Sequence, residues 1–287
     1  MKTSNISIIL PAKNEAEHLD NLLPRVIQHY PDAEIIVVND GSTDNTLDIC
    51  NKYNIKVVSH PYAKGNGAAV KTGAKAATGE VLVFMDADGQ HNPGDIEKLM
   101  EKYHSGFHMV VGARDFKSQA SIFRGLANKL YNFIGSWMVG HSIRDLTSGF
   151  RIVNAKKFRQ FLFLLPNGFS YPTTITMSFF RAGYSVGYLP INVSNRVGKS
   201  HIRLFRDGAR FLLIIFKVGT LYSPLKLFLP ISFSFFILGG GYYLFTYLFY
   251  SRFTNMSALL LVTSVIIFLI GLVSEQITSL MYSNSDR

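Results

Sequence analysis

The fold of this chain is decided by the stretch Val81-Leu82-Val83-Phe84-Met85-Asp86-Ala87-Asp88-Gly89-Gln90-His91-Asn92-Pro93. Its apolar first part runs into two carboxylates separated by one small residue, and turn-forming residues follow. A short apolar run bounded by turn residues is typical of a buried β-strand. Ligands of open α/β sheets bind at the carboxyl ends of the strands. We therefore expect Asp86 and Asp88 to lie close together at the mouth of a crevice.

Two interpretations of this acidic turn are open. Hard oxygen ligands on a turn suit Mg²⁺ or Mn²⁺, and these cations in turn suit a nucleotide diphosphate. The alternative is a pair of solvated aspartates that cap the next helix, and a bare Asp-x-Asp does not choose between the two. The rest of the chain supplies the context.

Strand patterns and helix patterns alternate along the first two thirds of the chain. The helical spacing of apolar residues is clearest at 19–30, 96–103 and 118–139. This alternation predicts an α/β fold with a mostly parallel sheet that is covered on both faces. The predicted strands are 6–10, 34–38, 55–58, 81–85, 109–111, 152–153 and 185–193.

Two long segments near the end of the chain, 227–250 and 253–274, contain no charged residue. Each is longer than the roughly 20 apolar residues that cross a bilayer. The short linker Ser251-Arg252 makes them a hairpin. We expect two transmembrane helices, at about 227–250 and 254–276, rather than two fully buried helices of a soluble core.

The segment before the hairpin, 201–224, combines one cationic helical face with apolar residues around the rest of the helix. This pattern predicts a helix at the membrane surface, although an ordinary amphipathic core helix has the same spacing. The positive charges lie before the first span, whereas the linker holds only Arg252. The positive-inside bias places the N-terminal domain and both termini in the cytoplasm. The cations before the first span are Arg203, Arg206, Arg210, Lys217 and Lys226.

Composition narrows the class of protein further. Of the 287 residues, 48% are hydrophobic and 17% are charged, and the net charge is +10. A basic balance suits anionic lipid headgroups and phosphate-bearing substrates as well as nucleic acid. Cys50 is the only cysteine, so no internal disulfide forms. We see no signal-peptide pattern at the N-terminus and expect none.

Four short motifs follow four successive predicted strands: Pro11-Ala12-Lys13-Asn14-Glu15, Val38-Asn39-Asp40-Gly41-Ser42, Lys64-Gly65-Asn66-Gly67 and Asp86-Ala87-Asp88-Gly89-Gln90. In this order they resemble the family 2 inverting glycosyltransferases of GT-A fold. More narrowly, they resemble the polyprenyl-phosphate glycosyltransferases, which include dolichyl-phosphate mannose synthase and bacterial undecaprenyl-phosphate glucosyltransferases. The resemblance covers roughly residues 5–200, and the two terminal spans fit the bacterial members.

The resemblance implies a donor site for a nucleotide sugar and a divalent cation, Mg²⁺ or Mn²⁺. Asp88 and Gln90 match the metal ligands, with Asp86 close by and facing the nucleotide. For Asp40 an alternative is a simple turn and helix start, and for the Lys64 motif it is a flexible loop. The implied nucleotide-sugar residues are Pro11, Ala12, Asn14, Glu15, Asp40, Lys64, Asp86, Arg196 and Lys199.

On the acceptor side, a lipid phosphate needs cations near the membrane plane. Arg124 and Asn128 are one helical turn apart, so they are placed to grip one phosphate. Arg114 and Arg151 are further candidates, and each also fits an ordinary surface arginine. Asp145 is the acid that the resemblance offers as a base or positioning group, and with Asp88 it completes the predicted catalytic pair. A lipid phosphate is already an anion, so the reaction does not require a base.

The sequence departs from the family pattern in two places. The helix after Gly149-Phe150-Arg151 has no acidic residue over 171–176, where dolichyl-phosphate mannose synthases tend to have one. That puts mannose and guanine specificity in doubt and moves the choice of sugar toward this segment. No Gln-x-x-Arg-Trp segment is present, and the single tryptophan is Trp137. Processive polysaccharide synthesis is therefore not expected.

We accordingly expect a cytoplasmic GT-A domain (1–200), an interfacial helix (201–224) and a transmembrane hairpin (225–287). The expected reaction is metal-dependent, inverting transfer of one sugar from a nucleotide sugar, a UDP-hexose, to undecaprenyl phosphate. The alternatives are use of GDP-mannose, a lipid-linked or protein glycan as acceptor, and a non-enzymatic membrane anchor or assembly factor. A nucleic-acid partner is not expected, because the positive charges cluster beside the spans. Membrane lipids and a homo-oligomeric partner complete the expected contacts.

Overall fold

The computed structural model describes residues 5–114, 122–168, 170–193, 216–217 and 219–283, and of residues 122–128 it describes the backbone alone. The chain forms two compact units. The first comprises Met1–Trp137 with His141–His201, and the second comprises Met138–Gly140 with Ile202–Arg287.

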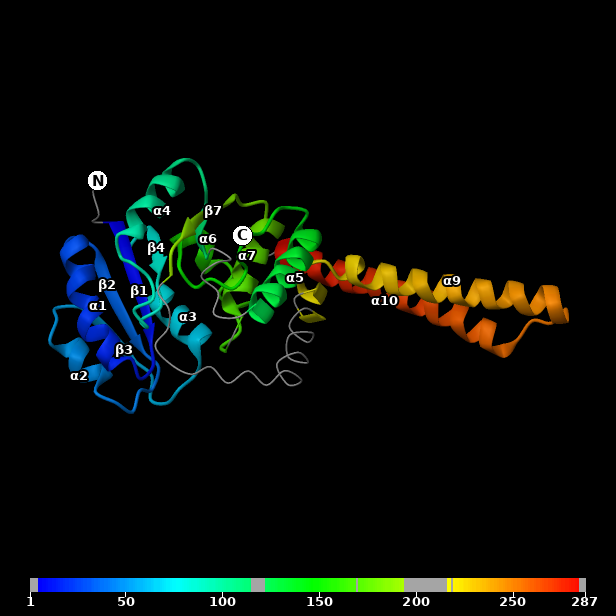
Figure 1. Ribbon diagram of the computed structural model, residues 1–287, viewed down its shortest axis with the longest axis horizontal. Coiled ribbons are helices and arrows are strands. Elements are labelled where there is room, and N and C mark those ends of the chain that lie inside the picture. The colour runs from blue at the N-terminus through cyan, green and yellow to red at the C-terminus, as the bar shows by residue number, and fades with distance from the viewer. Residues whose placement is uncertain (1–4, 115–121, 169, 194–215, 218, 284–287) are drawn as a thin grey trace. The chain divides into compact units, whose positions relative to one another are not determined.

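The first unit is built on a seven-stranded sheet in the order β3-β2-β1-β4-β6-β5-β7. Figure 1 labels β1 to β4 and β7 of this sheet. Four of its pairings are parallel, and only β6 runs antiparallel to both of its neighbours, β4 and β5. The predicted α/β class with a mostly parallel sheet is confirmed. The strands are β1 (Ile6–Ala12), β2 (Glu34–Asn39), β3 (Lys56–Ser59), β4 (Val81–Phe84), β5 (Met109–Arg114), β6 (Arg151–Asn154) and β7 (Val186–Ile191).

Helices cover both faces of the sheet, as the near-continuous apolar strands require. Alternate side chains of β1 show this: Ile8 and Leu10 belong to the core cluster formed with α1 and α4, whereas Ile9 faces α3. A Cβ added to Gly73 of α3 would lie 2.4 Å from Ile9 Cγ2. The helices of the first unit are α1 (Ala16–His29), α2 (Thr46–Asn51), α3 (Asn66–Ala76), α4 (Asp95–His104), α6 (Ala155–Arg159), α7 (Tyr171–Arg181) and all but the last two residues of α5 (Ile122–Val139).

The order of the strands brings the predicted site motifs to one edge of the sheet. β1 lies between β2 and β4 and is parallel to both, so the carboxyl ends of these strands meet. Backbone hydrogen bonds hold the residues that follow β2 and β4 against β1. The Asp40 N–H donates to the Ala12 carbonyl at 2.8 Å, and the Met85 N–H donates to the Ile9 carbonyl at 3.1 Å. This edge is the place where ligands of open α/β sheets bind.

The second unit contains two long helices, α9 (Pro224–Tyr250) and α10 (Asn255–Ser283). Both are long and apolar enough to cross a membrane, as predicted. Ser232 and Ser264 join them, because each hydroxyl donates to the other residue's carbonyl at 2.9 Å. The predicted interfacial helix over 201–224 lies largely outside the described residues.

Candidate active site

The loops that follow β1 and β2 are bonded to each other. Asn14 takes a left-handed backbone conformation with φ 56°, and its N–H donates to Ser42 Oγ at 3.0 Å. The Thr43 N–H donates back to Asn14 Oδ1 at 2.8 Å, and the Glu15 N–H donates to Thr46 Oγ1 at 3.1 Å. Hydrogen bonds therefore join the two loops that carry the motifs predicted to hold the nucleoside.

The Asp40 carboxylate organises the loop that follows β3. One of its oxygens accepts the Lys64 N–H and the other the Gly65 N–H, each at 2.8 Å. His60 Nδ1 lies 2.7 Å from the carboxylate, and His60 Nε2 lies 2.9 Å from Thr72 Oγ1. Burial alone would raise the pKa of Asp40, but the bonds from His60 and the two N–H groups lower it below its ordinary value. Both carboxylate oxygens therefore hold the loop. The predicted contact of Asp40 with the nucleoside remains a prediction.

The glycines of the Lys64 motif are explained by packing. A Cβ added to Gly67 would lie 2.0 Å from the Pro166 carbonyl oxygen, and one added to Gly65 would lie 2.6 Å from the Asn167 carbonyl oxygen. The same Asn167 carbonyl accepts the Ala68 N–H at 2.9 Å. Close approach of the start of α3 to 166–168 therefore requires glycine, whether or not a phosphate binds there.

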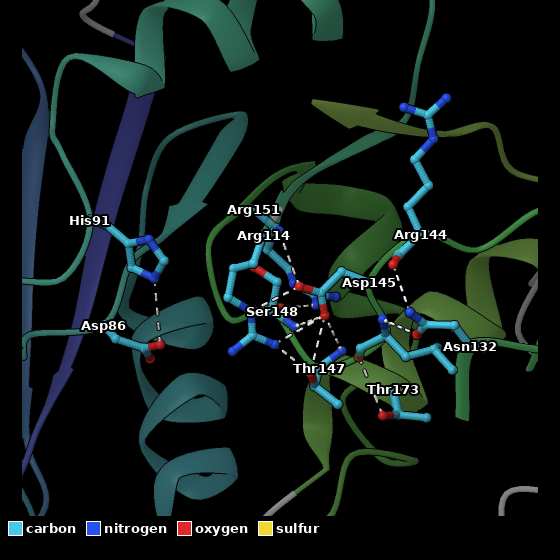
Figure 2. Close-up of polar contacts among 11 residues, drawn as sticks. Asp86, His91, Arg114, Asn132, Arg144, Asp145, Thr147, Ser148, Arg151 and Thr173 are labelled. Atoms are coloured by element: carbon cyan, nitrogen blue, oxygen red, sulfur yellow. Dashed lines mark hydrogen bonds and ion pairs between the residues drawn. The ribbon is translucent and has the colours of Figure 1, made fainter. Parts of the chain in front are cut away.

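The acidic turn after β4 lies beside the segment that leads into β6. The Asp86 side chain is 37% exposed, and its Oδ2 lies 3.9 Å from His91 Nε2 (Figure 2). Asp88 Oδ1 accepts the Gln90 N–H at 3.2 Å, which closes the turn. Both aspartates are partly exposed, and Asp88 also accepts the bond that closes the turn.

The oxygen donors of this turn fit a divalent cation in kind. Carboxylates and a side-chain amide suit Mg²⁺ or Mn²⁺, which commonly fill their remaining positions with water and substrate phosphate oxygens. Within the described part of the chain, no group of three or more His, Cys, Asp or Glu side chains is arranged to hold a metal. A cation held by Asp86, Asp88 and Gln90 would take its remaining ligands from water or from phosphate oxygens.

Asp145 and Arg114 form a bidentate pair (Figure 2). Arg114 Nε donates to Asp145 Oδ2 at 2.8 Å, and Nη2 donates to Oδ1 at 3.1 Å. The N–H groups of Thr147 and Ser148 donate to the same carboxylate at 2.9 and 3.0 Å. Burial would raise the pKa of Asp145, but the bonds and charge of Arg114 outweigh it and lower the pKa. This geometry favours a positioning role over that of a general base.

Arg151 lies inside the first unit, with no exposed surface. Its guanidinium donates to the Pro172 carbonyl and to Thr176 Oγ1, both at 3.1 Å, and to the Ser148 carbonyl. Burial lowers the pKa of this guanidinium. These contacts tie β6 to α7, so they favour a structural role over the predicted contact with the acceptor phosphate.

The start of α7, where the sequence departs from its relatives, is likewise buried. Thr173 Oγ1 accepts the Tyr131 O–H at 2.9 Å, and Tyr171 donates to the Gly149 carbonyl at 3.3 Å. Any effect of this segment on the choice of sugar is therefore exerted through the residues it supports. Sequence reasoning missed these links, and it also missed His60 and Thr72, because isolated residues far apart in the chain produce no pattern.

Other predicted residues lie outside what the structure describes. The backbones of Arg124 and Asn128 fall in α5 but their side chains are not described, and Arg196 and Lys199 fall in the undescribed segment 194–215. Pro11 and Ala12 form the end of β1, paired with Val38 and Asn39. The structure thus gathers the donor-side motifs and leaves the acceptor-side residues partly undescribed.

The order and direction of the strands define a GT-A-like α/β domain. The family model described as Glycosyl transferase family 2 matches residues 7–162, more than half of the chain, so the chain belongs to this family of glycosyltransferases. A second model, the GtrB C-terminal hairpin, matches residues 223–280. The predicted family resemblance is confirmed, with the glycosyltransferase model in the first unit and the hairpin model in the second.

Curated relatives match half of the chain or more. A dolichol-phosphate mannosyltransferase of Pyrococcus furiosus is 36% identical over 162 residues, which are 50% of this chain and 45% of the relative. An undecaprenyl-phosphate 4-deoxy-4-formamido-L-arabinose transferase of Proteus mirabilis is 32% identical over 50% of this chain and 47% of the relative. The match therefore spans about half the length of these two relatives. A polyprenol monophosphomannose synthase of Mycolicibacterium smegmatis is 27% identical over 68% of this chain and 79% of the relative.

Solved structures share the fold. Glucosyl-3-phosphoglycerate synthase from Mycobacterium tuberculosis, in complex with Mn²⁺, UDP and glucosyl-3-phosphoglycerate, superposes with a TM-score of 0.60 at 20% identity. The match covers 75% of this chain and 78% of that chain. At this level of identity the likeness establishes the architecture.

Proposed function

We propose that this protein transfers one sugar from a nucleotide sugar, a UDP-hexose, to a polyprenyl phosphate, undecaprenyl phosphate, at the membrane surface. The observation that carries the proposal is the meeting of the ends of β1, β2 and β4, each with its family motif, at one edge of the sheet. The polyprenyl-phosphate transferases among the relatives support the acceptor class.

On the donor side, hydrogen bonds within the chain hold the loops at this edge of the sheet together. The bond between Asn14 and Ser42 joins the loops after β1 and β2. Asp40, which contacts His60, holds the loop after β3. A bound Mg²⁺ or Mn²⁺ at Asp86, Asp88 and Gln90 would neutralise charge on the departing diphosphate. The Mn²⁺ and UDP in the structural relative support this assignment.

On the acceptor side, an anionic lipid phosphate attacks the sugar carbon from the face opposite the leaving diphosphate, which inverts that carbon. No proton has to be removed, which agrees with the lowered pKa of Asp145. We assign Asp145 and Arg114 to positioning, and Arg124 and Asn128 to the acceptor phosphate.

An exposed apolar face on α5 supports a working site at a lipid surface. Leu130, Phe133 and Trp137 recur at helical spacing, and they are 52%, 70% and 48% exposed. Aromatic residues of this kind, tryptophan above all, favour the membrane–water interface. With the hairpin of α9 and α10, this face supports the domain plan of a cytoplasmic domain at 1–200, an interfacial helix at 201–224 and a membrane hairpin at 225–287.

A second donor, GDP-mannose, remains in the proposal because two relatives are named for mannose transfer. Incubating the purified full-length protein with Mn²⁺, radiolabelled UDP-hexoses or GDP-mannose, and undecaprenyl phosphate tests the proposal. A lipid-linked product with one donor supports it. Asp88→Ala should abolish turnover, whereas Asp48→Ala, on the exposed side of α2, should leave it unchanged. No product with any donor would refute the proposal.

A further inference from the structure

The His91 side chain is buried beside the acidic turn, although its place in a turn suggests a solvated residue. It is 6% exposed and stacks on Phe150, with ring centroids 4.8 Å apart and planes inclined by 26°. Its Nδ1 atom has no hydrogen-bond partner among the described residues. Burying a polar ring without such a bond is costly. Packing alone therefore does not account for histidine, since phenylalanine would fill the same space without that cost.

The other ring nitrogen of His91 faces Asp86. His91 Nε2 lies 3.9 Å from Asp86 Oδ2, close enough for electrostatic attraction and too far for a direct hydrogen bond (Figure 2). Asp86 is the carboxylate that we assign to the cation and the nucleotide. The imidazole is thus placed beside the carboxylate whose orientation matters to the donor site.

Gly149 bounds the same carboxylate. A Cβ added to Gly149 would lie 2.8 Å from Asp86 Oδ2 and 3.0 Å from Oδ1. The backbone of Gly149 shows no positive φ, so space rather than conformation requires glycine here. Its position is fixed by the Tyr171 O–H, which donates to its carbonyl, and by the fully buried Phe150 next to it.

We propose that His91 is a positioning residue for Asp86, acting with the Gly149 backbone to hold the carboxylate in the orientation that binds the cation and the nucleotide. This inference rests on the proposed function of the acidic turn. Groups behind a metal-binding carboxylate orient it and reduce the freedom it loses on binding. Phe150 stacks on His91, and its neighbour Gly149 lies against the Asp86 carboxylate. The two adjacent residues therefore position both His91 and Asp86.

The test measures Mn²⁺ affinity of the full-length protein by electron paramagnetic resonance, with and without UDP. His91→Phe keeps a ring to stack on Phe150 and removes both nitrogens. We expect Mn²⁺ affinity in the presence of UDP to fall about tenfold, with no loss of thermal stability. His91→Gln, whose amide nitrogen reaches toward the place of Nε2, should bind Mn²⁺ more tightly than His91→Asn, whose nitrogen mimics Nδ1.

A double-mutant cycle separates positioning from a general structural effect. In an Asp86→Asn background, His91→Phe should cause no further loss, because the carboxylate it positions is gone. Gly149→Ala should also weaken Mn²⁺ binding, whereas the control Gly168→Ala should not, since a Cβ there meets nothing within 4 Å.

Unchanged Mn²⁺ affinity in His91→Phe overturns this inference, as does an equal loss in the Asp86→Asn background. If His91→Phe does not fold, the Mn²⁺ affinities of His91→Gln and His91→Asn are compared instead. Equal affinities of these two variants overturn the inference. Wild-type protein that binds neither Mn²⁺ nor UDP would overturn the proposed function as well. Wild-type binding with unaffected variants overturns the role of His91 alone.

Discussion

The Asp145 carboxylate is buried and accepts bonds from Arg114 and from two backbone N–H groups. Replacing it by asparagine leaves the guanidinium without its bidentate partner. Because Arg114 keeps some contact with water, we expect Asp145→Asn to lower the free energy of unfolding by roughly 2 kcal/mol. Denaturant unfolding in detergent measures this, and an unchanged midpoint would contradict the positioning role.

The same carboxylate predicts a pH dependence. The pKa of Asp145 is lower in the folded protein than in the unfolded chain, so the unfolded state binds more protons in acid. Its contribution to stability is therefore present above about pH 4 and is lost as the pH falls toward the folded pKa. Thermal unfolding of wild-type protein and Asp145→Asn at several pH values should converge in acid. A constant difference at every pH would argue against this linkage.

Cys50 offers a direct probe of the first unit. It is fully buried, and burial raises the pKa of its thiol to about 11. Since the thiolate is the reactive form, the native protein should not react with a thiol reagent at pH 8. Denatured protein should react fully at this single cysteine. Rapid labelling of the native protein would mean that α2 does not pack as described.

At the scale of elements, the hairpin depends on where its glycines face. A Cβ added to Gly271 of α10 would lie 2.8 Å from Phe228 Cβ of α9, whereas one added to Gly241 meets nothing within 4 Å. We expect Gly271→Ala to loosen the helix pair and Gly241→Ala to be neutral. Resistance of the hairpin to SDS unfolding measures the difference. Equal resistance in both variants would show that Gly271 is not at a close contact.

The elements themselves were largely predictable, and the exceptions have physical causes. The strands that become β1, β2 and β4 are apolar runs closed by turn residues, so their ends were placed within two residues. The orientation of β6 was not predictable, because its two-residue apolar core, Ile152-Val153, says nothing about direction. The short helix α6 was missed because five residues hold too little periodicity.

The site was predictable where a motif follows a strand, and not where a contact joins distant residues. The position of Asp86 at the sheet edge follows from its strand. The Asp40–His60–Thr72 series does not, because its members come from three separate segments. The Arg151 side chain was misleading for the same reason: its partners on α7 lie far along the chain, so a buried arginine looks like a surface one in the sequence.

At the scale of the molecule, the proposed topology can be tested with the linker between the spans. Charge placement predicts the first unit in the cytoplasm and Arg252 on the opposite side. In sealed cells, Arg252→Cys should react with a membrane-impermeant maleimide, whereas Ser142→Cys should react only after lysis. The buried Cys50 should not add background. The reverse pattern would invert the topology.

The proposed reaction joins one sugar to a polyprenyl phosphate. Mass spectrometry of the lipid fraction tests it most directly, after the purified full-length protein is incubated with Mn²⁺, undecaprenyl phosphate and one nucleotide sugar at a time. We expect one new lipid whose mass exceeds that of undecaprenyl phosphate by a single sugar residue, formed from a UDP-hexose. A lipid carrying several sugars, or an unmodified lipid beside a sugar-modified glycan or protein acceptor, would contradict it.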